Sequence, residues 1–110
     1  MNRLPLSAAG AALLRALLKR AGTSRDRILL TEIQSTEWQS LTFVGERHRM
    51  QLKISGADAA AAVQRLRDGL EDAEFALPGH IVADIALTGQ STTAPDGTTT
   101  IDLEALTIVE

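Results

Sequence analysis

The stretch HIVADIALTGQSTTAPDGTTTIDLEALTIVE, residues 80–110, contains two strands joined by a short turn. Apolar residues recur at every second position along HIVADIALTG and again along TTIDLEALTIVE, a pattern typical of β-strands. Between them, Pro95, Asp96 and Gly97 favour a turn in which the glycine takes the left-handed conformation. The sequence therefore predicts a C-terminal β-hairpin over about residues 80–109.

Both faces of this hairpin carry apolar side chains. With Pro95–Gly97 as the loop, Leu87 faces Ala105 and Ala83 faces Val109, which gives one apolar face: Ile81, Ala83, Ile85, Leu87, Leu103, Ala105 and Val109. A sheet with one face in water should alternate cleanly, yet the reverse side also holds apolar residues. We therefore expect a helix of this chain or a second copy to cover it. We predict a C₂ homodimer through these reverse-side residues: Val82, Ala86, Leu106 and Ile108.

A helix is predicted before the hairpin, over about residues 57–74. Ser55-Gly56-Ala57-Asp58 has the form of a capping box, in which the serine and the acid three residues later bind the first free amides of a helix. Apolar residues then recur every three or four positions, with charged residues between them. Pro78-Gly79 ends the connection that follows.

The N-terminal segment predicts a second helix, over about residues 6–22. Its leucines fall at helical spacing, and Gly22 suits its end. Residues 1–27 carry six basic groups and one acidic group, whereas residues 28–110 carry five basic and thirteen acidic groups. We expect the apolar stripe to pack on a sheet and the charge to be neutralised by the acidic body, with an anion-binding arm or a membrane-surface helix as the alternatives.

Residues 27–55 read as three strands. The segments 27–35, 38–45 and 46–55 are rich in β-forming residues, and Gly45-Glu46 suits a tight turn between the last two. The expected fold class is therefore α+β: a five-stranded, mainly antiparallel sheet with two helices, in the order α-β-β-β-α-β-β. One domain spans residues 1–110, with the helices on one face of the sheet.

Candidate binding residues follow from the register of the hairpin expected around Gly45-Glu46. Trp38 then faces Lys53, on the face that also carries Arg49, and these three predict a surface anchor for a partner. His48 faces Phe43 on the apolar side at the edge of the core. There it would lie at a pocket mouth or a subunit contact and respond to pH, or simply cap the core.

The sequence contains no recognisable catalytic or metal-binding motif. It has no cysteine, which excludes disulfides and thiolate metal sites. Its two histidines have no carboxylate at metal-ligand spacing, and no glycine-rich loop leads from a strand into a helix. We expect no cofactor and no metal, and we favour a non-enzymatic role.

The leading interpretation is a cytoplasmic, homodimeric interaction or ligand-binding module with a protein or small-molecule partner. The alternative is a small enzyme or ligand carrier with a pocket between the N-terminal helix and the sheet, using His48 or His80. A second alternative is RNA binding, since the first five expected elements follow the order of the double-stranded RNA-binding fold. However, the second helix opens with Asp58 and no lysine on an acidic body, so no nucleic-acid partner is expected. No segment is apolar enough for a membrane span, and no membrane partner is expected.

Overall fold

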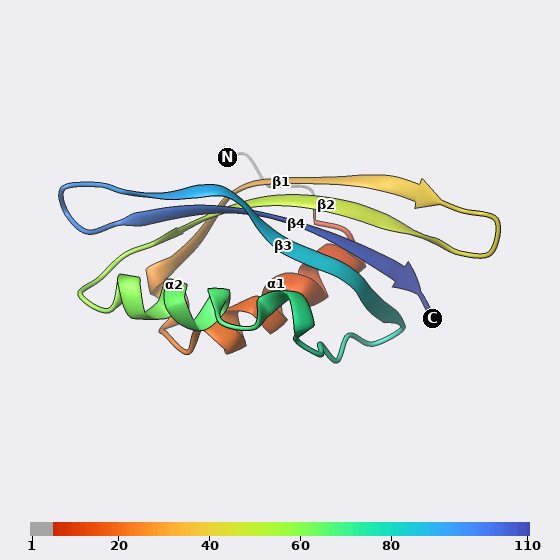
Figure 1. Ribbon diagram of the computed structural model, residues 1–110, viewed down its shortest axis with the longest axis horizontal. Helices are drawn as coiled ribbons and strands as arrows, with labels where there is room; N and C mark the ends of the chain where they lie inside the picture. Colours follow the sequence, from red (N-terminus) through yellow and green to blue (C-terminus); the bar gives the residue numbers. More distant parts are fainter. Residues whose placement is uncertain (1–5) are drawn as a thin grey trace.

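The computed structural model describes residues 6–110 of the chain. Its elements are α1 (Ala8–Ala21), η1 (Arg25–Arg27), β1 (Ile28–Gln39), β2 (Val44–Ile54), α2 (Ala59–Arg67), η2 (Leu70–Asp72), β3 (His80–Thr93) and β4 (Thr99–Val109). The main helices and strands follow the order α-β-β-α-β-β (Figure 1). The prediction of five strands in the order α-β-β-β-α-β-β was therefore wrong.

Two long strands, β1 and β2, occupy the segment in which three shorter strands were predicted. The predicted strand 27–35 continues to Gln39, because Thr36 and Glu37 extend the ladder by pairing with Arg47 and Glu46. The predicted strand 38–45 is therefore divided between the end of β1, the turn and the start of β2. The turn lies at residues 40–43, where the Ser40 amide donates to the Phe43 carbonyl at 2.9 Å. Gly45 and Glu46 thus lie inside β2, and the predicted turn at these residues does not exist.

The sheet is antiparallel throughout, and both helices cover one of its faces. The strand order is β1-β2-β4-β3, so β2 and β4 are central. Both helices lie below the sheet in Figure 1, and the connection through α2 carries the chain from β2 to the far edge. The core lies between these two layers, and its largest fully buried apolar side chains are Leu13, Leu17, Leu52, Ile54, Leu66, Ile101 and Leu103.

The helix ends agree with the sequence in one case and differ in another. In α1, Gly22 ends the helix with φ 66°, as predicted. At its start, the Ser7 hydroxyl accepts a hydrogen bond from the Gly10 amide at 3.0 Å. The capping box before α2 is absent. The Asp58 side chain caps no amide and lies 3.7 Å from Arg27, so it ties the start of α2 to the α1–β1 connection instead.

The C-terminal hairpin keeps its predicted turn but changes register along its length. Near the turn, Thr93 pairs with Thr99 as expected. Irregularities between Thr88 and Thr92 and between Val82 and Asp84 then shift the strands, so that Leu87 pairs with Leu103. The second shift turns Val82 toward the core and leaves Ile81 exposed. The predicted reverse-side set is wrong for Val82, whereas Ala86, Leu106 and Ile108 pair with residues of the face opposite the helices.

Candidate functional site

The face of the sheet opposite the helices, called here the helix-free face, is built from outward-pointing residues of all four strands. The ladders place Gln34 opposite Arg49 and Arg49 opposite Glu104. They also place Glu32 opposite Gln51 and Gln51 opposite Asp102. The central part of this face is therefore polar and charged, with Arg49 as its basic residue and Glu32, Asp102 and Glu104 as its acidic residues.

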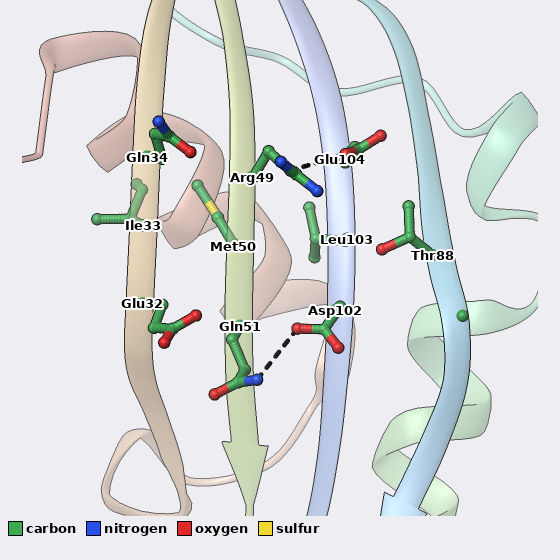
Figure 2. A pocket seen from close by; sticks show the side chains of 11 residues that line it. Glu32, Ile33, Gln34, Arg49, Met50, Gln51, Thr88, Asp102, Leu103 and Glu104 are labelled. Carbon is green, nitrogen blue, oxygen red and sulfur yellow. Dashed lines mark hydrogen bonds and ion pairs between the residues drawn. The ribbon is translucent and has the colours of Figure 1, made fainter.

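A shallow groove of about 710 Å³ crosses the centre of this face. Figure 2 shows it from the helix-free side, with the helices behind the sheet. Nε of Arg49 lies 2.9 Å from Oε1 of Glu104, and Nε2 of Gln51 donates to Oδ1 of Asp102 at 3.2 Å. The side chains that line this helix-free groove come from β1, β2, β4 and β3: Glu32, Gln34, Arg49, Gln51, Asp102, Glu104 and Thr88.

The chemistry of the groove suits recognition of a polar surface. It offers three carboxylates, one guanidinium and two amides, which together donate and accept hydrogen bonds over an open area. About two-thirds of the Arg49 side chain is exposed, so its ion pair with Glu104 is solvated and exchangeable. Within residues 6–110, no three histidine or acidic side chains converge as a metal site would require.

The structure does not bring the predicted anchor residues together. Trp38 pairs with Gly45 near the turn of the first hairpin, whereas Lys53 pairs with Leu29 at the other end of the same ladder. Leu29 and Trp38 are nine positions apart along β1, which corresponds to about 30 Å of strand. Arg49 lies between them, and it is the only one of the three that lines the helix-free groove. A binding role for Trp38, Arg49 and Lys53 stays a prediction.

His48 lies inside the core and not at a pocket mouth, since its exposed fraction is 0%. Its Nδ1 is 2.8 Å from the Ser35 hydroxyl and its Nε2 is 2.8 Å from the Thr107 hydroxyl. Burial lowers the pKa of His48, Glu46 opposes this shift by attraction, and His80 adds to it by repulsion. His80 itself lies at the start of β3, where its Nδ1 donates to the Pro78 carbonyl at 3.1 Å.

Sequence reasoning missed the groove residues other than Arg49. Glu32, Gln34 and Gln51 occupy alternate outward positions of β1 and β2, but their convergence with Asp102 and Glu104 depends on β2 pairing with β4. The outward alternation of charges was visible in the sequence. The pairing of these two strands was not, because the helix α2 and all of β3 separate them along the chain.

None of the helices in the described part of the chain is both long enough and apolar enough to cross a bilayer. Two helices on one side of a small antiparallel sheet, with a charged groove on the other, define a two-layer α+β module. The chain matches the family described as "Tail completion protein gp17" over residues 1–110. It belongs to this family of tail proteins.

A solved structure supports the same fold. The chain resembles a component of the "Virion of native gene transfer agent (GTA) particle" with a TM-score of 0.60 and 16% sequence identity. The likeness covers 94% of this chain and 98% of that one. No curated protein matches the sequence.

Family membership corrects the functional predictions. A tail completion protein is a structural protein of a phage-like tail, so the interpretation as a ligand-binding module was wrong, and the enzyme and RNA-binding alternatives have no support. The cytoplasmic location was also wrong, since tail proteins belong to a particle. As a tail protein, the chain assembles with other structural proteins.

Proposed function

We propose that this protein is a structural component of a phage-like tail and that it completes the tail by binding a neighbouring tail protein through the helix-free groove. The observation that carries the proposal is the family match over the whole chain. The likeness to a gene transfer agent virion component, at the level of the fold, supports it.

The groove is the part of the helix-free face best suited to such a contact. Charges of both signs lie in it: Arg49 lies between Gln34 and Glu104, and Gln51 lies between Glu32 and Asp102. Complementary charges across an interface fix its register and reject wrong partners more than they add affinity. A protein that must occupy one defined place in a tail needs this kind of specificity.

We also propose that the chain forms the predicted homodimer, through Ala86, Leu106 and Ile108 on the same face. Leu106 is 8% exposed although it lies outside the core cluster beneath the helices, and it pairs with Arg47 and Asp84 on the helix-free face. Ile108→Asp should then weaken self-association through this contact and leave the circular dichroism spectrum unchanged. Sedimentation velocity of wild type and variant over a range of concentrations tests this contact directly.

The tail role is tested in cells that produce phage-like particles containing this protein. Deletion of its gene is expected to leave particles with incomplete tails under the electron microscope, and the wild-type gene should restore them. Arg49→Glu should restore them poorly, because it removes the basic side chain of the groove and adds a fourth carboxylate to Glu32, Asp102 and Glu104. Arg67→Glu on α2, an exposed position away from the groove, is the matched control and should restore complete tails. Complete tails in the deletion strain would contradict the proposal.

A further inference from the structure

The end of the first hairpin, residues 37–46, is called here the arm. It projects beyond the helices at one end of the molecule (Figure 1), and its β1–β2 ladder continues to the pair Gln39 and Val44. Leu41 at its turn is fully exposed, and Phe43 and Val44 are each about half exposed. Hairpin turns are normally polar, and a cluster of large apolar side chains at such a tip indicates a contact with another molecule.

The arm also carries an unfavourable pair of charges. Glu37 lies directly opposite Glu46 across the two strands, and residues 37–46 contain no lysine or arginine. Like charges at directly opposed positions destabilise a sheet. Neither glutamate forms an ion pair with any of the residues 6–110. Two basic groups from a partner would convert this local repulsion into attraction.

A second surface of the same chain has the complementary character. A groove of about 560 Å³, called here the α1 groove, runs along α1 beside the segment that precedes β3, and its lining residues are Ala12, Arg15, Ala16, Lys19, Arg20, Glu74, Phe75, Ala76 and Pro78. Arg20 is engaged by the carbonyls of Leu66 and Asp68. Arg15 and Lys19 are exposed, and neither forms an ion pair within the described part of the chain.

The two surfaces match in spacing as well as in charge. Arg15 and Lys19 are four residues apart on one helix, which separates their Cβ atoms by about 5–6 Å. Glu37 and Glu46 are opposed in a ladder, which separates their Cβ atoms by about 4.5–5.5 Å. The apolar tip at Leu41 and Phe43 corresponds to the apolar floor formed by Ala12, Ala16 and Phe75.

We propose that the arm of one copy binds in the α1 groove of a second copy, with Glu37 and Glu46 facing Arg15 and Lys19. This inference rests on the proposed role as an assembling tail protein, and it names a second copy of the chain as one partner. The arm cannot reach its own groove, because the ladder holds it extended away from the helices. The contact joins two different surfaces, so it repeats from copy to copy in a head-to-tail manner, unlike a C₂ dimer.

A charge exchange tests the contact. One variant carries Glu37→Lys and Glu46→Lys, and the other carries Arg15→Glu and Lys19→Glu. Each variant alone should self-associate about tenfold more weakly than the wild type, or weaker still, as measured by sedimentation velocity. Their mixture should regain it, because every arm then meets a groove of opposite charge. Arg15, Lys19 and Glu37 are exposed and Glu46 is partly buried, so thermal unfolding checks that both variants fold. Unchanged association of the single variants, or a mixture that does not recover, would overturn the proposal.

Engineered thiols give an independent readout, because the natural sequence has no cysteine. Leu41→Cys and Ala16→Cys are made in separate chains of different tag length, mixed and mildly oxidised. The mixed disulfide should exceed both symmetric ones. Ala94→Cys, at the exposed tip of the other hairpin, replaces Leu41→Cys as the control and should give little product. Equal cross-linking by the Ala94→Cys control, or no cross-linking by Leu41→Cys, would refute the docking of the arm. Neither result bears on the proposed tail role, which the particle experiment above tests separately.

Discussion

His48 and Thr107 are joined by a hydrogen bond of 2.8 Å between Nε2 and Oγ1, inside the sheet where β2 meets β4. Both side chains are completely buried. The Thr107 hydroxyl also lies 3.5 Å from the Glu46 carbonyl, to which it donates, so it accepts the Nε2 proton of His48. Nδ1 of His48 then accepts from the Ser35 hydroxyl at 2.8 Å. One polar chain thus connects β1, β2 and β4 near the base of the arm.

Replacement of Thr107 by valine should destabilise the fold by about 1–3 kcal/mol, because it keeps the shape of the side chain but leaves the buried Nε2–H of His48 without an acceptor. Urea unfolding measures the change. Thr92→Val, at an exposed position of β3, is the control and should change the free energy of unfolding by less than about 0.5 kcal/mol. Equal stability of the two variants would show that the Thr107 hydrogen bond contributes nothing.

The lowered pKa of His48 predicts that the protein becomes less stable in mild acid. The ordinary pKa of 6.5 applies to the unfolded chain, and the folded pKa lies below it. As the pH falls through this interval, the unfolded state binds a proton before the folded state does, so the free energy of unfolding decreases; below both values the loss stops. Urea unfolding at about pH 7.5 and about pH 5.5 measures this decrease in the free energy of unfolding.

His48→Gln is the comparison for the pH experiment. It cannot titrate, and the acidic residues contribute equally to both proteins, so the difference between the two pH profiles isolates the histidine. The wild type should lose more stability than His48→Gln over the same interval. Parallel profiles would mean that His48 takes up its proton equally easily in the folded and the unfolded chain.

Gly45 should not tolerate even one additional carbon. A Cβ at this position would lie 1.9 Å from the Thr107 carbonyl oxygen, which belongs to the backbone of β4 and cannot move aside cheaply. Gly45→Ala should therefore destabilise the fold by about 1–3 kcal/mol. Gly10→Ala in α1 is the contrast: its nearest neighbour is the Ser7 hydroxyl at 3.2 Å, and alanine favours a helix. Thermal unfolding of both variants tests this, and equal melting temperatures would contradict it.

Gly45 also explains why the first hairpin was predicted with the wrong turn. A glycine between two β-rich segments is a common turn signal, but a glycine inside a strand also marks a close approach of two backbones. Whether Gly45 forms a turn or a close approach depends on where β4 lies. The sequence of residues 38–55 alone carries no information about the position of β4. The partner of Trp38 was consequently misplaced from Gly45 to Lys53.

The faces of the side chains were nevertheless predicted better than their partners. The error in the first hairpin is eight positions along β2, an even number, so His48 still points to the core and Arg49 still points away from it. In the second hairpin, the shift between Val82 and Asp84 is odd, and Val82 changed face. Irregularities of this kind arise from packing between strands and leave no mark in the alternation of a single strand.

The ion pair of Arg49 and Glu104 should matter for assembly and little for folding. The Arg49 side chain is 68% exposed, so the 2.9 Å pair is screened by water and salt. Arg49→Ala should change the free energy of unfolding by less than about 1 kcal/mol, whereas tail completion should fall because the groove loses its only basic side chain. Urea unfolding and electron microscopy of complemented particles give the two readouts. Lys53→Ala, on the same strand and face but outside the groove, is the control and should leave both nearly unchanged. A large loss of stability in Arg49→Ala, or tails completed as often as with the wild-type chain, would contradict this assignment.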